Sequence, residues 1–196
     1  MKVAAIEHLR NRQEELGQFL TATPVADFMA SMFGPLPGAT RRTPRDRWGL
    51  LVKAIIETFC ARWSLGAVIL GVRDTRRSIV HFNAKALAIL GVALDSAAKI
   101  PDVIVHHKAK NRLLLIEAVT SAGPVDEKRR KELENLFAGC KAGLVFVTAF
   151  ENRRTMQTFV SHIAWESEVW LAEDPDHMIH FNGRSEERRV GKECVP

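Results

Sequence analysis

The fold is set by two apolar runs on either side of a polar turn: Ile100-Pro-Asp-Val-Ile-Val-His106, then Lys108-Ala-Lys-Asn111, then Arg112-Leu-Leu-Leu-Ile-Glu-Ala-Val-Thr120. Apolar runs of this length, separated by a short polar segment, predict a β-hairpin. Asp102 lies near the start of the first run, and Glu117 lies near the end of the second. Antiparallel pairing brings these two ends to the same edge of a sheet. The sequence therefore predicts that the two carboxylates converge.

Converging carboxylates are typical of a magnesium site, since Mg²⁺ prefers hard oxygen ligands. A metal placed there polarises a phosphoryl oxygen and activates a water for phosphodiester hydrolysis. An isolated Asp and Glu are more often a turn residue and a solvated strand end, and that alternative stays open here. The run Leu113-Leu-Leu-Ile116 favours the metal site, because a strand buried on both faces partly desolvates a carboxylate near its end.

The composition indicates one globular domain with a single good core, in a chain of 196 residues. No apolar stretch approaches the roughly 20 residues that span a bilayer, and Glu7 and Arg10 interrupt the segment where a signal peptide needs an apolar run. A cytoplasmic protein is therefore expected. The three scattered cysteines (Cys60, Cys140 and Cys194) form neither a CxxC pair nor an even disulfide set.

The net charge of +5 permits binding to a polyanion such as DNA without demonstrating it. Basic residues gather in three places: Arg41 to Arg47, Arg73 to Arg77, and Lys128 to Lys131. Each cluster is able to contact phosphates. Each is equally compatible with a solvated surface, and for any single cluster the solvated surface is the more common case.

Further elements are predicted around the central hairpin. Before it come a helix from Pro44 to about Trp63, a second hairpin (66–72 and 78–82), and a short helix that Asn83 caps and Gly91 ends. After it come a helix from Gly123-Pro124 to about Ala138, a buried strand (142–148), a helix (152–164), and two strands (168–172 and 178–181). The strand at 113–119, the helix that follows it and the strand at 144–148 form a βαβ unit with parallel strands.

Three regions are expected along the chain. Residues 1–40 are predicted to be a helical N-terminal segment, with helices at 3–20 and 24–33. Residues 41–183 carry the predicted sheet and its helices. Residues 184–196 are charged and lack a core pattern, so they are interpreted as a tail that is disordered or not native to the protein.

Beyond the single motif, six segments in order resemble one known family: Ile100-Pro-Asp-Val103, Ile116-Glu-Ala-Val-Thr-Ser-Ala-Gly-Pro-Val125, Lys128-Arg129-Arg130, Ala142-Gly-Leu-Val-Phe-Val-Thr-Ala-Phe150, Ile163-Ala-Trp-Glu-Ser-Glu-Val-Trp170 and Pro175-Asp-His-Met-Ile-His-Phe-Asn-Gly183. They are similar to the C-terminal domain of BsuBI/PstI-type restriction endonucleases, within the PD-(D/E)XK nuclease superfamily. The resemblance is dense from 100 to 183 and continues more weakly back to about residue 42.

This resemblance implies an α/β (α+β) fold of the restriction-endonuclease type, in which helices flank a central mixed sheet. It implies a type II site-specific restriction endonuclease that hydrolyses double-stranded DNA with Mg²⁺ and acts as a homodimer, one active site per strand. Asp102 and Glu117 would be the catalytic metal ligands, assisted by the carbonyl of Ala118. A separate DNA methyltransferase would be its partner in a restriction-modification system.

Two features depart from the superfamily pattern. The pattern places Lys two positions after the Glu, where this chain has Val119. Lys128 and Arg129, on the helix that follows, are therefore the candidates for the basic catalytic group.

Glu57, on the helix before the core, is either a further carboxylate of the metal shell or, more commonly for such a residue, part of a solvated helix face. The family's longer N-terminal DNA-binding region corresponds at most to a remnant here.

Two alternative functions remain at this point. Val119 and the short N-terminal region are also compatible with a DNA-binding or assembly module that keeps the nuclease fold without catalysis. His106-His107 with Asn111 faintly suggests a nuclease that uses a histidine and a metal, but such sites require a ββα finger, which these apolar strands do not fit.

Overall fold

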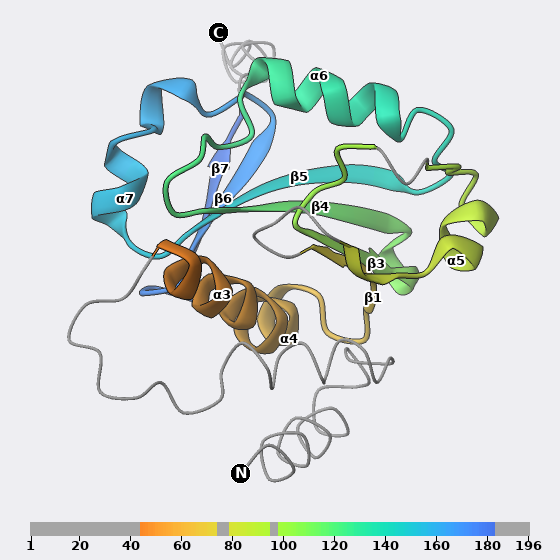
Figure 1. The fold of residues 1–196 in the computed structure, drawn as a ribbon, viewed down its shortest axis with the longest axis horizontal. Helices are drawn as coiled ribbons and strands as arrows, with labels where there is room; N and C mark the ends of the chain where they lie inside the picture. Colours follow the sequence, from red (N-terminus) through yellow and green to blue (C-terminus); the bar gives the residue numbers. More distant parts are fainter. Residues whose placement is uncertain (1–43, 74–78, 95–97, 183–196) are drawn as a thin grey trace, which may run out of the picture.

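A computed structural model describes residues 44–73, 79–94 and 98–182. Its centre is a seven-stranded sheet in the order β2-β1-β3-β4-β5-β6-β7, with α3 below the sheet and α6 above it in Figure 1. The strands are β1 (Val68–Arg73), β2 (Ile79–Phe82), β3 (Val103–His107), β4 (Arg112–Val119), β5 (Gly143–Phe150), β6 (Ser167–Leu171) and β7 (Met178–Phe181). The helices are α3 (Pro44–Ala54), η1 (Ile55–Phe59), α4 (Cys60–Trp63), α5 (Ala84–Ile89), η2 (Lys108–Lys110), α6 (Glu127–Leu136), α7 (Arg153–Gln157) and η3 (Val160–His162).

The central hairpin forms as predicted. β3 and β4 pair antiparallel with Val103 opposite Ile116, so Asp102 and Glu117 occupy the next position along the same register. The turn between the strands closes through η2 and Asn111, whose φ of 47° lies in the left-handed region that Asn tolerates. The hairpin therefore delivers both carboxylates to one edge of the sheet.

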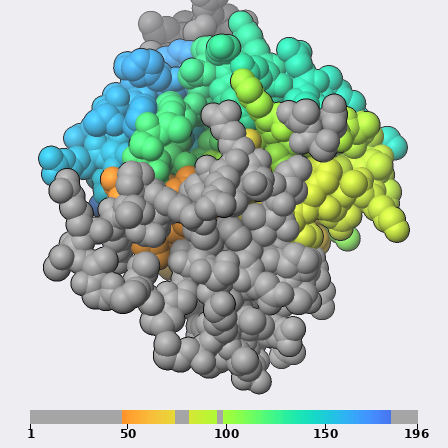
Figure 2. Space-filling model, viewed as in Figure 1, coloured from red at the N-terminus to blue at the C-terminus, as the bar shows by residue number. Residues whose placement is uncertain are grey.

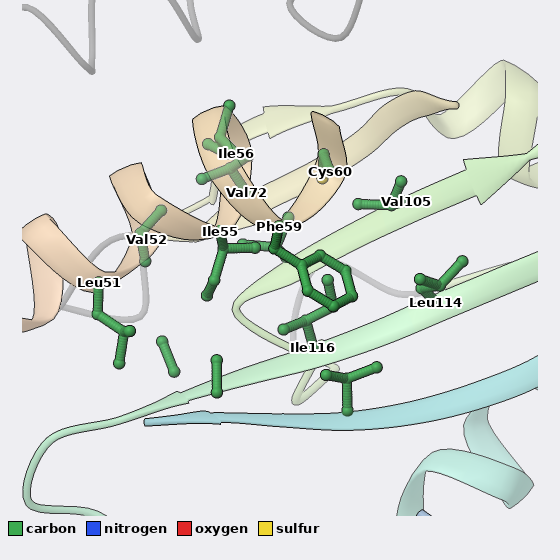
Figure 3. Packing of buried hydrophobic residues seen from close by; sticks show 14 of the residues in the cluster. Leu51, Val52, Ile55, Ile56, Phe59, Cys60, Val72, Val105, Leu114 and Ile116 are labelled. Atoms are coloured by element: carbon green, nitrogen blue, oxygen red, sulfur yellow. The ribbon is translucent and has the colours of Figure 1, made fainter. Parts of the chain in front are cut away.

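The continuous apolar run of β4 is explained by burial on both faces. Leu114 and Ile116 pack toward α3 and η1, as Figure 3 shows, whereas Leu113 and Leu115 belong to the cluster under α5 and α6. β4 and β5 pair parallel, and α6 connects them, so the predicted βαβ unit is confirmed. A strand covered on both faces is held in one place, which fixes the position of Glu117.

The predicted helix from Pro44 to Trp63 is confirmed in extent but not in regularity. Its middle turn, Ile55–Phe59, is π-helical, a local widening that sequence periodicity does not reveal. Leu51, Ile55 and Phe59 are all buried against the sheet, as their spacing predicts.

Two other helices differ from their predicted bounds. α6 begins at Glu127 rather than at Gly123-Pro124, because the Asp126 side chain caps it by accepting the Arg129 N–H at 2.6 Å. Upstream of that cap, the Val125 N–H donates to Thr148 Oγ1, which holds the chain against β5. The helix predicted for 152–164 is only α7 followed by the short η3, and the Thr158 hydroxyl donates to the Thr155 carbonyl where α7 ends.

The predicted helices at 3–20 and 24–33 and the predicted tail at 184–196 lie outside the described residues. None of the helices in the described ranges has both the length and the apolar character required to cross a membrane.

Gly91 supplies a test of local packing. Its φ is +85°, and a Cβ added to it would meet the backbone oxygen of Gly139. Gly91→Ala is expected to lower the free energy of unfolding by about 2 kcal/mol, measured by urea titration. The matched control is Gly123→Ala, where an added Cβ meets no atom within 4 Å. Equal stability of the two variants would contradict the packing described for Gly91.

Candidate active site

Asp102 lies immediately before β3 and is almost completely buried, with 6% of its surface exposed. Both carboxylate oxygens are engaged: Oδ2 accepts the Ala118 N–H at 2.9 Å, and Oδ1 accepts from the Arg73 guanidinium at 3.2 Å. The Arg73 N–H also donates to the Asp102 carbonyl at 2.9 Å. Asp102 is thus fixed between its two neighbouring strands, β1 and β4.

Glu117 points toward α6 and meets Arg129. Its Oε1 accepts from Arg129 Nε at 2.8 Å and from Arg129 Nη2 at 2.7 Å, and only 13% of the Glu117 side chain is exposed. The same guanidinium donates to the Lys99 carbonyl at 2.9 Å and to Glu132 at 3.3 Å. These additional bonds anchor Arg129 above the strand edge.

The register of β3 and β4 brings the two carboxylates together, and the charge of Asp102 acts on Glu117. The pKa of Glu117 is raised to about 7, first because the group is buried and then because the negative charge of Asp102 is close. Arg129 and Arg73 act in the opposite direction, but they do not compensate fully. A pair of buried, mutually repelling carboxylates is an environment that a divalent cation relieves.

The donor set fits Mg²⁺, which takes few protein carboxylates and completes its shell with water and phosphate oxygens. Ala118 lies beside both carboxylates, since its N–H is bonded to Asp102. Glu57 is not brought into this set: the described residues contain no group of three acidic, histidine or cysteine side chains suited to a metal. Glu57 instead lies on η1, 4.0 Å from Lys53.

The two basic candidates on α6 occupy different environments. Arg129 contacts Glu117 directly, whereas Lys128 is exposed. Both line a shallow pocket of about 240 Å³ that also includes Glu117, Pro124 and Asp126. Lys128 is therefore at the mouth of the pocket and Arg129 at its floor. Val119, at the position where the superfamily has Lys, is only 1% exposed and packs against Phe150, so that position holds no cation.

Arg73 is a functional candidate that the sequence reasoning missed. The sequence shows it only as the first member of a basic cluster, yet its side chain is 13% exposed and contacts Asp102. The sequence does place Arg73 at the end of an apolar strand, as it places Glu117. That position indicates a contact with Asp102 only once β1 is known to lie next to β3.

A second pocket opens where the chain leaves β4 and β5. It measures about 590 Å³ and is lined mainly by polar side chains: Arg47, Thr120, Glu151, Asn152, Arg154, Thr155, Thr158 and Phe159. Figure 2 shows the green segment after β4 at the surface between α3 (orange) and α7 (blue). Arg47 is paired with Glu151 at 2.7 Å, so its charge is already partly neutralised.

The histidine-based alternative is wrong for this fold. His107 lies at the far end of β3 from Asp102 and accepts the Lys110 N–H at 3.3 Å within the hairpin turn. Burial lowers the pKa of His106 on the same strand. Neither histidine joins a metal-binding cluster among the described residues.

Comparisons with known proteins agree with this geometry. The model of the BsuBI/PstI restriction endonuclease domain matches residues 38–184. The chain is 50% identical over 133 residues to the type II restriction enzyme BsuBI of Bacillus subtilis, covering 68% of this chain and 42% of that protein. It is 32% identical over 141 residues to the type II restriction enzyme AplI of Arthrospira platensis, covering 69% and 44%.

Among solved structures, the SdaI restriction endonuclease superimposes with a TM-score of 0.67 at 40% identity, covering 76% of this chain and 45% of that one. The chain thus spans less than half the length of these relatives. The predicted fold class is confirmed by this match, as is the resemblance on which it rested. The match to the family model extends over most of the chain and includes both carboxylates, so the chain belongs to the BsuBI/PstI restriction endonuclease domain family.

Proposed function

We propose that this chain is the catalytic part of a type II site-specific restriction endonuclease, which hydrolyses phosphodiester bonds of double-stranded DNA with Mg²⁺. The observation that carries the proposal is the pair Asp102 and Glu117, buried and converging at one edge of the sheet. Relatives named as type II restriction enzymes support the reaction class.

In this proposal Asp102 and Glu117 hold the metal, and the Ala118 carbonyl assists them. When bound there, Mg²⁺ would supply Lewis-acid stabilisation of the phosphate and a lowered pKa for water. Oδ2 of Asp102 accepts the Ala118 N–H, so Oδ1, which pairs with Arg73, would be the oxygen offered to the metal. That hydrogen bond keeps the carboxylate oriented before DNA arrives.

Lys128 and Arg129 supply positive charge from the α6 side. Both line the pocket that contains Glu117. Arg129 neutralises Glu117, and its guanidinium would become available to a phosphate oxygen if a metal ion balanced the charge of that carboxylate. Lys128, exposed at the mouth of the pocket, is placed to meet the DNA backbone.

The proposed partners are those expected of a type II restriction enzyme, the type named for the relatives. Double-stranded DNA is the substrate, a homodimer cuts both strands of a symmetric site, and a separate methyltransferase protects host DNA. The cytoplasm is the proposed location. Residues 41–183 form the proposed catalytic domain, supported by the family match over 38–184. Residues 1–40 are proposed to belong to a DNA-binding region, and 184–196 are proposed to be a charged tail outside the catalytic domain.

A module that binds DNA without cutting it is a second candidate, favoured by one observation. Each carboxylate already has an arginine partner, Arg73 for Asp102 and Arg129 for Glu117. Such pairs are also found in sites that serve only structure.

Plasmid cleavage separates the two candidates. Purified protein is incubated with a mixed-sequence supercoiled plasmid in Mg²⁺, and a matched reaction contains EDTA. Discrete fragments that require Mg²⁺ are expected, and their ends map the recognition site. Folded protein that shifts DNA on a gel without cutting it would favour the binding module.

A further inference from the structure

We propose that Arg73 is a third cation of this active site and contacts the scissile phosphate from the side of Asp102. The inference rests on the proposed nuclease function and adds a residue to it. Arg73, Asp102 and Glu117 lie at one edge of three adjacent strands, β1, β3 and β4. Arg73 and Glu117 therefore lie on opposite sides of Asp102.

The guanidinium of Arg73 is unusually buried for an arginine at a strand end. Its side chain is 13% exposed, and its ion pair with Asp102 Oδ1 has a length of 3.2 Å. Within the described residues, its Nε is buried and has no hydrogen-bond partner. A buried donor without an acceptor is costly and calls for an explanation. A phosphate oxygen at the strand edge would supply the missing acceptor.

The charge arrangement gives Arg73 a task. Position 119, where the superfamily has its lysine, holds a buried valine, so positive charge must come from elsewhere. Arg73 contacts Asp102 through Oδ1, the oxygen that the Ala118 N–H leaves available. If a metal ion neutralised Asp102, the Arg73 guanidinium would no longer be needed there and would be free to contact a phosphate oxygen.

A purely structural role predicts something different. If Arg73 served only to orient Asp102, its removal would weaken metal binding. If Arg73 competes with the metal for Oδ1 and then binds phosphate, its removal leaves metal binding intact or makes it tighter, because a competing positive charge is lost. The two roles thus predict opposite changes in metal affinity.

Arg73→Gln is the informative variant, since the glutamine amide still donates to Asp102 but carries no charge. At saturating Mg²⁺ the single-turnover cleavage rate is expected to fall about 100-fold or more. Calorimetric titration of the DNA-free protein with Mg²⁺ is expected to show unchanged or tighter binding, by up to about tenfold. Arg73→Lys, which keeps the charge, is expected to recover part of the rate and guards against misfolding of the first variant.

The matched control is Arg62→Gln: Arg62 lies on α4, and the change removes its surface ion pair with Asp176 and leaves cleavage unchanged. Cleavage by Arg73→Gln at the wild-type rate would overturn the inference and leave the nuclease function standing. So would weaker Mg²⁺ binding that saturating Mg²⁺ compensates. A wild-type chain that does not cleave under Mg²⁺ would overturn both.

Discussion

Asp102→Asn and Glu117→Gln are each expected to lower the single-turnover rate of Mg²⁺-dependent cleavage at least about 1,000-fold, roughly 4 kcal/mol in activation free energy. Each change removes one negative charge from a two-carboxylate site while keeping the size of the side chain. With a single carboxylate left, the protein has too few anionic ligands to hold the cation against water. Supercoiled plasmid at saturating Mg²⁺ provides the measurement.

A surface carboxylate serves as the matched control. Asp174 pairs with Arg153 at 3.0 Å and with His177 at 2.7 Å, and it follows β6, which is three strands away from β3 and Asp102 in the sheet. Asp174→Asn is expected to cleave within about threefold of wild type, since exposed ion pairs contribute little. Wild-type cleavage by either active-site variant would remove that carboxylate from the metal site.

Sequence patterns were sufficient for the parts of the site that depend on one hairpin. Two apolar runs and a polar turn predict the pairing of β3 with β4, and this pairing alone makes Asp102 and Glu117 converge. The continuous apolar run of β4 also indicated a strand covered on both faces. Local order along the chain therefore predicted the acidic half of the site.

The basic half depended on longer-range packing. Arg73 reaches Asp102 only because β1 inserts beside β3, a neighbour relation that periodicity does not specify. The choice between Lys128 and Arg129 had a usable signal in the spacing of Arg129, Leu133 and Phe137. Leu133 and Phe137 are buried. Residues four apart share one helix face, so this spacing predicts that Arg129, and not Lys128, faces the sheet.

Helix ends were the other point of difference, and side-chain capping explains it. Gly123-Pro124 is a typical helix start, but the helix begins after Asp126, because the Asp126 carboxylate caps it by accepting the Arg129 N–H. The cap and the bond from Val125 to Thr148 set the rotation of α6 over the sheet. Small changes in the start of this helix decide which of two adjacent basic residues meets Glu117.

Glu117→Gln is also expected to stabilise the metal-free protein at neutral and alkaline pH, by about 2 to 3 kcal/mol. Folding raises the pKa of Glu117 from 4.5 to about 7, mainly through burial. The folded state therefore holds this proton more tightly than the unfolded state does. Wild-type stability falls as the pH rises from about 4.5 to about 7, because in this range the unfolded carboxylate is ionised and must take up a proton on folding.

Glutamine avoids this penalty and still offers an oxygen to Arg129. The difference in unfolding free energy between Glu117→Gln and wild type should be close to zero below about pH 4.5, grow up to about pH 7, and stay constant above it. Urea titrations in EDTA at pH 4, 6 and 8 measure it. Asp174→Asn provides the control, since the pKa of Asp174 is lowered by His177 and Arg153.

The pKa of Asp174 is shifted in the opposite direction to that of Glu117, so the control predicts the opposite pH dependence of stability. A carboxyl group with a lowered pKa favours the folded state once it is ionised, so Asp174→Asn does not gain stability as the pH rises. If Glu117→Gln were no more stable than wild type at pH 8, the favourable contacts with Arg129 and Arg73 would outweigh burial. Glu117 would then be an ordinary salt-bridge partner. A gain in stability combined with the loss of cleavage would identify Glu117 as a group held in an unfavourable state for the sake of its chemistry.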